Sequence, residues 1–343
     1  MLRFLRNIIS YINFLFLKII FGRKSDNSTN SIIFLNTGSM GDVMISSILM
    51  ENESLFRNYE NLYFICRSEY SDLFFSYKGL FNLIFINIKR YRFNIFYRIY
   101  FLNKLHKINA RRFYHITAER GIINDEISLL SGSHDVFTTC SRHTYLGNFF
   151  GKLNDKKYTG ILYPDVQNEY EKHSLLIKEI TGVNEIEIYN RHFFSFDKNI
   201  FYPEYITIAP LSSDKRKQWS IEKYKELADI ISQKYNVELI ADKKNINNLN
   251  YIKSDNPNIN FRITNLKELI SLINYSSLFI GNDSGPAHIA FKLNKKSIII
   301  IKEEHYNNCF PFDLKNNNVR YITENKNGNI TVGDISEILK HLL

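Results

Sequence analysis

The sequence predicts an α/β protein made of two doubly wound units, each a parallel sheet with helices on both faces. Short apolar runs alternate with longer amphipathic segments, the pattern of parallel strands covered by helices. This alternation lapses near residue 165 and restarts near residue 205. The 343 residues also exceed what one compact core usually holds, so two domains of roughly 150 residues are expected.

The first unit is expected to begin after the polar stretch 25–30. Its expected strands are short apolar runs, at residues 32–35, 62–66, 83–86 and 113–117. Its expected helices have apolar residues at helical spacing, at residues 42–56, 69–77, 93–107, 122–130 and 144–152. The stretch 165–203 lacks this rhythm and is interpreted as the interdomain region.

The second unit repeats the alternation from residue 205. Its expected strands lie at residues 205–209, 237–241, 259–262, 278–280 and 297–301. Its expected helices lie at residues 221–234, 245–253, 266–275, 284–293 and 332–342. Two such units in tandem are expected to face each other across a cleft, with ligands at the carboxyl ends of the strands.

Positive charge is concentrated at the N-terminus. The formal net charge is +9, and the first 24 residues hold no acid and five basic residues, Arg3, Arg6, Lys18, Arg23 and Lys24. The rest of the chain has little basic excess, which argues against a nucleic-acid-binding protein. The three cysteines are far apart and form no CxxC pair, which argues against a disulfide framework or zinc ribbon and fits a reducing compartment.

Residues 2–21 form an amphipathic helix in projection. Six polar residues fall within an arc of about 140°, namely Arg3, Arg6, Asn7, Ser10, Asn13 and Lys18. Most apolar residues fall opposite, but Phe14, Leu17 and Phe21 interrupt the polar side. The apolar stretch before Lys18 is too short to span a bilayer, and no cleavage site follows. Three interpretations remain: an in-plane helix on an anionic membrane, a helix packed on the protein's own core, or a short signal anchor.

The first cluster of candidate site residues lies between a predicted strand and a predicted helix, at residues 36–43. Gly38 and Gly41 allow a sharp turn and a close approach to a ligand. Asp42 follows at the expected helix start, where its carboxylate is either a helix cap or a group that projects into the cleft. The spacing is not GxGxxG, so a dinucleotide fingerprint is not supported.

The second cluster, residues 210–219, also follows a predicted strand. It contains Ser212, Ser213 and three consecutive basic residues that end at Lys217. Cations and hydroxyls in one loop suit a phosphate-bearing ligand, and a run of charge is also typical of a solvated surface. Trp219, the only tryptophan of the chain, follows and favours an ordered loop.

The third cluster, residues 281–288, joins a predicted strand to a predicted helix. The N–H groups at a helix start bind anions, and Gly285 allows a close approach. Asp283 and Ser284 precede the helix, Pro286 suits its first turn, and His288 lies on it. The pattern alone fits a helix cap as well as a diphosphate site.

Together the three clusters resemble glycosyltransferase family 9, the lipopolysaccharide heptosyltransferases. The N-terminal signature of that family, a strand followed by SxGD and a hydrophobic helix, is matched by Ser39-Met40-Gly41-Asp42-Val43. Its middle signature, a basic residue shortly before a tryptophan, is matched by Lys217 and Trp219. Its C-terminal signature, GxDSGPxHxA, is matched by Gly281, Asp283, Ser284, Gly285, Pro286, His288 and Ala290. The order and separations also agree, over about residues 32–301.

The resemblance implies a GT-B fold and a direct role for these residues. Asp42 matches the general base that takes the proton of the acceptor hydroxyl. Lys217 matches the lysine that holds the donor diphosphate, with Ser212 and Ser213 beside the phosphates. The C-terminal signature supplies further donor contacts, from Asp283, Ser284, Gly285 and His288. Cations and backbone N–H groups would stabilise the leaving diphosphate, so neither a metal nor a cofactor is expected.

Some positions depart from the family pattern. Asn36 stands where the family often has Arg or Lys, and Pro210-Leu211 replaces Pro-Gly. A glycine-rich turn with a following acid, used at the nucleotide ribose, is replaced by residues 241–244. The basic N-terminal helix is additional to the common start of the family.

The domain boundaries follow from these observations. We expect a membrane-surface helix over residues 1–24, an acceptor-binding Rossmann-like domain over 31–190, a donor-binding Rossmann-like domain over 200–330 and a final helix over 331–343.

The resemblance predicts an inverting, metal-independent glycosyltransferase. It would move a sugar such as heptose from a nucleotide-diphospho-sugar to a lipopolysaccharide core or a related bacterial surface glycan. The implied partners are that donor, a lipid-linked acceptor and an anionic membrane, at the cytoplasmic face of the cytoplasmic membrane, without nucleic acid. Two alternatives are a GT-B nucleotide-sugar epimerase and an inactive nucleotide-sugar-binding protein. The GD and GPxH clusters argue against the first, and Asp42 with Lys217 against the second.

Overall fold

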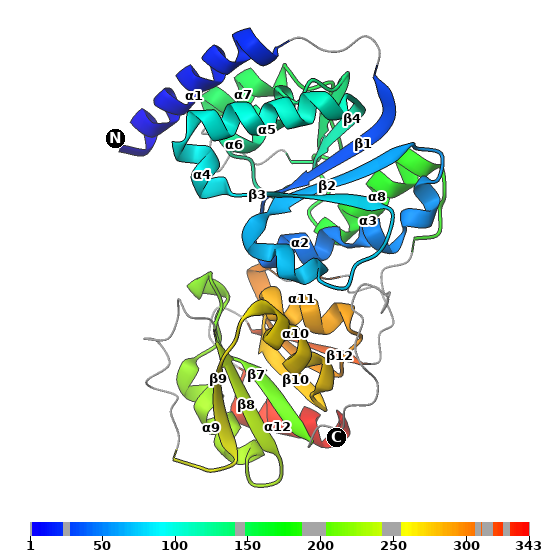
Figure 1. The fold of residues 1–343 in the computed structure, drawn as a ribbon. Coiled ribbons are helices and arrows are strands. Elements are labelled where there is room, and N and C mark those ends of the chain that lie inside the picture. Colours follow the sequence, from blue (N-terminus) through cyan, green and yellow to red (C-terminus); the bar gives the residue numbers. More distant parts are fainter. Residues whose placement is uncertain are drawn as a thin grey trace. The chain divides into compact units, whose positions relative to one another are not determined.

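The chain forms two compact units, each built on its own sheet (Figure 1). The computed structural model describes residues 2–22, 28–140, 148–186, 204–241, 255–305, 310, 318–324 and 330–342. The N-terminal unit comprises Met1–Ser71 and Lys78–Glu187, and the C-terminal unit comprises Asp72–Tyr77 and Ile188–Leu343. Both sheets have six strands, and the strands pair in parallel. Two doubly wound parallel sheets are what the alternating sequence pattern predicts.

The sheet of the N-terminal unit has the strand order β3-β2-β1-β4-β5-β6. Its strands are β1 (Thr29–Asn36), β2 (Asn61–Arg67), β3 (Phe81–Ile86), β4 (Ala110–His115), β5 (Asp135–Thr138) and β6 (Gly160–Ile161). The first four match the predicted apolar runs. The sequence pattern misses β5 and β6, because runs of four and two residues are too short to show a periodicity.

The helices of the N-terminal unit are shorter than the periodicity predicts. The predicted helix 42–56 is divided into α2 (Met40–Ser46), α3 (Ile48–Glu51) and the 3-10 turn η1 (Glu53–Phe56), and residues 69–77 form the 3-10 turn η2 (Ser68–Phe74). The predicted helix 93–107 is α4 (Ile88–Phe93) followed by α5 (Ile95–Ile108). Asn94 separates these two because it is extended, and its side chain accepts from the Tyr97 N–H to cap α5.

The interdomain interpretation of residues 165–203 is wrong for its first part, which forms α8 (Glu169–Thr181). The side chain of Asn168 caps this helix by accepting from the N–H groups of Tyr170 and Glu171, and Gly182 ends it with φ 74°. Such a cap stabilises a helix by about 1 kcal/mol. The other helices of this unit are α6 (Ile122–Leu129) and α7 (Asn148–Asp155).

The C-terminal unit has the strand order β12-β11-β10-β7-β8-β9. Its strands are β7 (Tyr205–Ala209), β8 (Asn236–Ala241), β9 (Ile259–Ile263), β10 (Leu278–Asn282), β11 (Ser297–Lys302) and β12 (Val319–Glu324). Its helices are α9 (Ile221–Ile231), α10 (Leu266–Tyr275), α11 (Gly285–Lys292) and α12 (Val332–Leu342), with the 3-10 turns η4 (Lys215–Lys217) and η6 (Glu303–His305). All these elements except β12 and the two turns are predicted from the sequence. The predicted helix 245–253 lies outside the described residues.

Each sheet is buried between its helices. In the C-terminal unit, Ile208 and Ile280 are fully buried in the same core cluster as Trp219, whose ring meets Tyr224 edge to face at 4.9 Å. This contact orders the chain after the second candidate cluster, as the single tryptophan suggests. Cys66 and Cys140 are buried thiols, as expected, and Cys309 lies outside the described residues.

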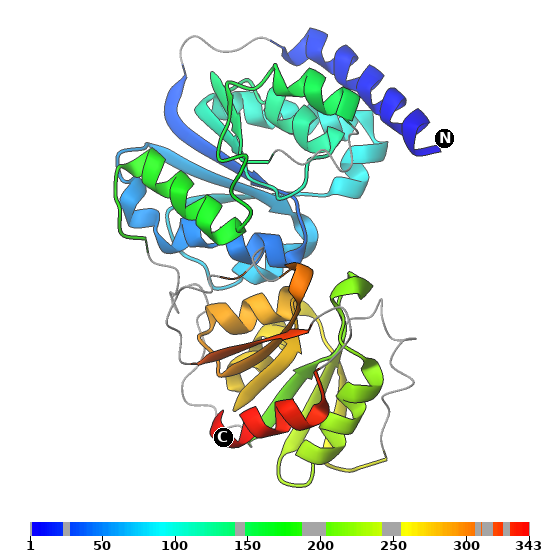
Figure 2. The ribbon, with the colours of Figure 1, turned by 180° about the vertical axis from the view of Figure 1, so that it is seen from behind.

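The N-terminal helix α1 (Leu2–Phe21) packs on the N-terminal unit (Figure 2). Phe14, Leu17 and Phe21 are buried in one cluster with Leu102 and Leu130. These three are the apolar residues that interrupt the polar side of the helix. Among the described residues, no helix is both long and apolar enough to cross a membrane.

Candidate functional site

The second and third clusters of the sequence meet in the C-terminal unit because β7 and β10 are neighbouring parallel strands. Gly281 pairs with Ala209, so the loops that follow both strands leave the same edge of the sheet. Asn282 joins these loops: its Nδ2 donates to the Pro210 carbonyl at 2.9 Å, and its Oδ1 accepts from the Trp219 N–H at 2.8 Å. Sequence reasoning does not single out Asn282, although it lies inside the C-terminal signature.

The charged centre of this site is the contact between Lys217 and Asp283. The Lys217 Nζ lies 2.5 Å from the Asp283 Oδ2, and the two side chains are 22% and 2% exposed. Burial by itself raises the pKa of Asp283, but the neighbouring His288 ring and the positive charge of Lys217 outweigh it and lower the pKa to about 2. Asp283 is therefore ionised at neutral pH, and the exposed part of Lys217 faces solvent.

The start of α11 lies directly after Asp283. Ser284 is the N-cap residue, with extended backbone, but its side chain makes no capping hydrogen bond. Its hydroxyl is buried without a hydrogen-bond partner among the described residues. The first N–H groups of a helix have no intrahelical acceptor, so this end of α11 offers donors to an anion.

His288 is held beside Asp283 by stacking. Its Nε2 lies 3.7 Å from the Asp283 Oδ1, and its ring stacks on Phe310 with centroids 4.4 Å apart and planes 7° apart. The side chain is nearly fully buried. The geometry therefore places the His288 ring beside the Asp283 carboxylate, a proximity that the sequence alone does not show.

The basic loop is more ordered than a solvated charge run. Arg216 makes two contacts with Asp214, at 3.0 and 2.6 Å, and Asp214 also caps the turn η4 by accepting from the Arg216 N–H. Lys217 instead turns toward Asp283. Ser212 is buried and Ser213 is exposed, and within the described chain neither hydroxyl makes a hydrogen bond. The predicted group of Lys217, Ser212 and Ser213 thus shares one loop, but only Lys217 contacts Asp283.

In the N-terminal unit, Asp42 takes part in a capping box at the start of α2. Its Oδ2 accepts from the Ser39 N–H at 2.6 Å and from the Ser39 hydroxyl at 2.9 Å, and the Asp42 N–H points back at the Ser39 Oγ. The helix-cap interpretation of Asp42 is therefore correct. The side chain is half-buried, so the capping role leaves it accessible.

The glycine and the asparagine before Asp42 shape this turn. A Cβ on Gly38 would overlap the Asp42 carboxylate, so no other residue fits there without displacing it. The Asn36 Oδ1 accepts from the Gly38 N–H at 2.9 Å, and its Nδ2 donates to the Asp42 carbonyl and to the Ser46 hydroxyl. Asn36 thus serves as a scaffold for the turn, while Gly41 is buried within α2.

Sequence reasoning misses the residues that surround Asp42. Tyr70, in η2, lies close enough for the Asp42 charge to contribute to its raised pKa of about 12, which is caused first by burial. Arg67, at the end of β2, pairs with Glu69 at 2.7 Å and lies over the Tyr70 ring. Their position directly after a strand next to β1 is the one signal that could have found them.

Another missed feature is a buried polar network at the far ends of β4 and β5. Arg120 binds Asp125 through two nitrogens at 3.0 Å, and Tyr158 donates to Asp125 at 2.8 Å. His115 lies beside Tyr158, and its burial lowers its pKa to about 4. The neutral imidazole and the paired charges make this network a rigid support for the strand ends.

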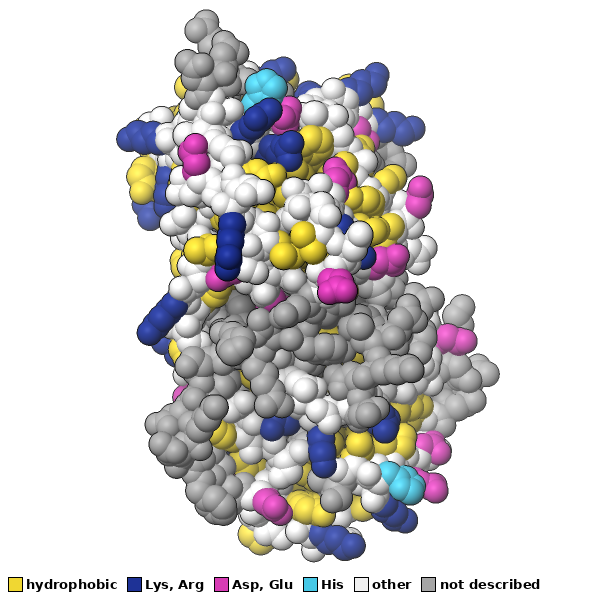
Figure 3. Space-filling view, turned by 90° about the vertical axis from the view of Figure 1, so that its right-hand side faces the viewer, with side chains coloured by type: hydrophobic (Ala, Val, Ile, Leu, Met, Phe, Trp, Pro, Cys, Tyr) yellow, Lys and Arg dark blue, Asp and Glu magenta, His cyan; other side chains and the backbone are white. Residues whose placement is uncertain are grey.

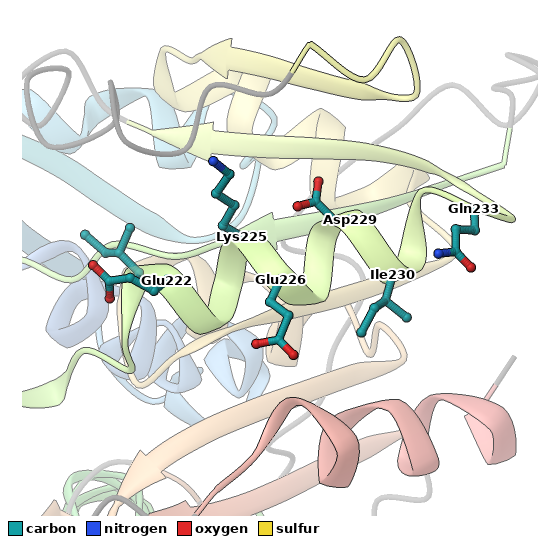
Figure 4. A pocket seen from close by; sticks show the side chains of 7 residues that line it. Glu222, Lys225, Glu226, Asp229, Ile230 and Gln233 are labelled. Atoms are coloured by element: carbon teal, nitrogen blue, oxygen red, sulfur yellow. The ribbon is translucent and has the colours of Figure 1, made fainter.

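Neither a metal-binding cluster nor a cavity adds a further site among the described residues. Within the described ranges, no group of three or more His, Cys, Asp or Glu side chains could hold a metal ion. A cavity of about 590 Å³ lies along α9, and its lining residues come from that helix and from Gln233 just after it (Figure 4). None of them is a predicted site residue, and their side chains spread along one helix surface without converging.

Comparison with known proteins relates the chain to one family of glycosyltransferases. Residues 179–331 match the model of glycosyltransferase family 9 (heptosyltransferase). A stretch of 92 residues is 35% identical to the lipopolysaccharide core heptosyltransferase OpsX of Haemophilus influenzae, and it covers 25% of this chain and 26% of that protein.

Solved structures resemble the fold over nearly the whole chain. The E. coli heptosyltransferase WaaC with ADP-2-deoxy-2-fluoro heptose gives a TM-score of 0.68 at 13% identity, covering 91% of this chain and 100% of that one. The E. coli ADP-heptose lps heptosyltransferase II gives 0.67 at 17% identity, covering 91% and 98%. The predicted GT-B fold of two Rossmann-like units is thereby confirmed. Residues 179–331 thus match the model of glycosyltransferase family 9, and the fold of the chain is similar to that of solved heptosyltransferases.

Proposed function

We propose that this protein is a glycosyltransferase that moves a sugar from a nucleotide-diphospho-sugar to a lipopolysaccharide core or a related surface glycan. The observation that carries the proposal is the contact between Lys217 and Asp283 at the start of α11. It unites two signatures that lie 66 residues apart in the sequence. ADP-heptose is the first donor to test, because the similar E. coli proteins are described with ADP and ADP-heptose.

In this proposal the C-terminal unit binds the donor. The diphosphate lies at the start of α11, where Lys217 supplies positive charge and the first helical N–H groups donate hydrogen bonds. The unpartnered Ser284 hydroxyl can donate to the same phosphates. Asp283 and His288 hold the ammonium of Lys217 in place. These groups would neutralise the charge that develops on the leaving diphosphate, which is the work a metal ion does in other transferases.

Asp42 is the proposed general base. Its position at the end of β1 and its half-exposed carboxylate suit a group that accepts the proton of an acceptor hydroxyl. The capping bonds from Ser39 reach one carboxylate oxygen and hold the group in a defined orientation. Attack by that hydroxyl on the face opposite to the diphosphate would invert the anomeric centre. Residues 1–24 are proposed to keep the protein at the anionic, cytoplasmic membrane surface where a lipid-linked acceptor lies.

The first experiment is a thermal-shift screen with ADP, UDP, GDP and their sugar conjugates. A ligand that binds only the folded protein raises its melting temperature, so the preferred nucleotide gives the largest shift. The preferred donor is then incubated with heptose-deficient lipopolysaccharide. Transfer with inversion supports the proposal. Donor binding without transfer or donor hydrolysis indicates a binding protein, and release of an isomerised donor sugar indicates an epimerase.

A further inference from the structure

The side of α1 that contacts the protein is the side that carries its polar residues. Phe14, Leu17 and Phe21 are buried there, and Lys157 on the body lies 4.5 Å from the Phe14 ring centre. The broad apolar side faces away. Among the side chains described on it, six large hydrophobic ones are 46–83% exposed, namely Ile9, Ile12, Leu15, Phe16, Ile19 and Ile20. A helix folded only for its own core would bury this side, so the exposed side has another use.

Two neighbouring helices extend this apolar surface. Figures 1 and 2 both show α1 alongside α5 and α7, and the ring contacts Phe21–His106 and Tyr11–Phe150, at 5.2 and 5.0 Å, confirm both neighbours. The most exposed large side chains of these two helices are Phe96 at 80% and Tyr100 at 64% on α5 and Phe149 at 69% on α7, and Phe93 at 77% ends α4, the helix directly before α5. We call these four, with the six of α1, the apolar face. Phe96 and Tyr100 are one helical turn apart on α5, so they point the same way.

The charge around the apolar face has one sign. No Asp or Glu occurs among residues 1–24 or 73–118, and the second stretch contains nine Lys and Arg. Among the described side chains of α1, α4 and α5, the exposed basic residues are Lys18, Lys89, Arg90, Arg92, Lys104 and Lys107. In α7, Asp155 is held by the buried Arg120. By contrast, the face in Figure 3 has basic, acidic and hydrophobic side chains interspersed.

We propose that the apolar face and its basic surroundings form one membrane-docking surface, built from α1, α4, α5 and α7, that inserts into the headgroup region of an anionic bilayer. Aromatic and aliphatic side chains ringed by Lys and Arg suit that region, where apolar groups reach the acyl boundary and cations meet lipid phosphates. A second copy of the chain would bring two positive surfaces together, which is unfavourable. This inference does not depend on the catalytic proposal.

The surface differs from a free amphipathic tail because α1 is already folded and docked. A tail would bind on its own and would fold on the membrane. Here α5 and α7 share the contact, so residues far from the N-terminus are required. That difference is what the test measures.

The test is vesicle flotation of the full-length protein with phosphatidylcholine alone and with phosphatidylcholine containing phosphatidylglycerol. We expect binding to the anionic vesicles only, weakened by salt. Phe96→Gln with Tyr100→Gln should weaken binding by about tenfold or more, because two large side chains no longer enter the interface. Lys89→Glu with Lys104→Glu should weaken binding similarly at low salt and less at high salt.

The matched control is Ile230→Gln, an exposed hydrophobic residue on α9 of the C-terminal unit. It should bind vesicles as the wild type does, and thermal melts should show all variants folded. If the Phe96→Gln/Tyr100→Gln protein binds vesicles as tightly as the wild type, α5 takes no part in docking. That result would overturn the proposed shared surface and would mean that α1 binds the membrane alone. No binding by the wild type would overturn membrane docking altogether. A dimer in sedimentation velocity, lost in the same double variant, would show that a second copy covers the face.

Discussion

Replacing Lys217 by alanine should weaken binding of a nucleoside diphosphate far more than binding of the nucleoside. A charge-assisted contact to phosphate is worth about 1.5–3 kcal/mol, which is about 10- to 100-fold in Kd. The loss should lie toward the upper end, because Asp283 would keep its charge without its partner at 2.5 Å and would repel the phosphates. Titration calorimetry with ADP and adenosine, or with the pair that the thermal-shift screen selects, measures both constants.

The control variants separate phosphate contact from loop structure. Asp283→Asn on the Lys217→Ala background removes the repelling charge, so the double variant should bind the diphosphate more tightly than Lys217→Ala alone. Arg216→Ala removes a neighbouring cation that is 75% exposed and pairs with Asp214, and it should change binding little. An equal loss of affinity for nucleoside and diphosphate would refute the reasoning, because it would mean that Lys217 acts through the fold of the loop.

The same contact contributes to stability in a defined pH range. The folded-state pKa of Asp283 is about 2 against an ordinary value of 3.8, a difference that corresponds to about 2 kcal/mol and that His288 and Lys217 produce together, so the Lys217 contact supplies only part of it. Because the pKa is lowered by folding, the contribution is complete above 3.8 and is lost as the pH falls toward 2. Urea unfolding should therefore show Lys217→Ala less stable by a constant amount from about pH 7 to about pH 5, with the difference shrinking only below about pH 4. A difference that changes near neutrality would point to another group.

Three further predictions concern catalysis and the N-terminus. Asp42→Asn should keep donor affinity, measured by calorimetry, and lower turnover about 10²-fold or more; near-normal turnover at saturating acceptor would leave Asp42 only its capping role. Turnover should persist in excess EDTA, because cations and helical N–H groups replace a metal, and rescue of an inhibited enzyme by Mg²⁺ would contradict this. Deleting residues 1–24 should lower the unfolding free energy by about 3 kcal/mol in urea titrations, since Leu102 and Leu130 lose their cover; unchanged stability would mean that α1 is not docked in solution.

Much of the candidate site in the C-terminal unit could be predicted from the sequence because its parts are local. A strand followed by a small loop and a helix start is encoded within ten residues, so Asp283, Ser284 and the start of α11 follow from residues 278–293 alone. The same holds for Asp42, which lies in the first turn of α2, shortly after β1. The strands could be predicted where both their faces are buried, as at β11, because an unbroken run of isoleucine is typical of a buried parallel strand.

The contacts between distant segments could not be predicted. The order of strands in the sheet places β7 beside β10, and only this order brings Lys217 to Asp283 and Asn282 to Trp219. The stacking of Phe310 on His288 depends in the same way on a residue that follows a later strand. No local sequence pattern predicts contacts of this kind. Each segment would form the same strand or helix in other topologies, so its sequence does not specify which segment lies beside it.

The N-terminal helix shows most clearly what the local sequence determines and what the tertiary contacts determine. Its sequence by itself determined an amphipathic helix over residues 2–21, because periodicity and propensity act along one element. Only the tertiary structure decided which side contacts the protein. Burial depends on the shape and chemistry of the partner surface, and Leu102 and Leu130 receive the narrow stripe of Phe14, Leu17 and Phe21, which leaves the broader apolar side in contact with the surroundings.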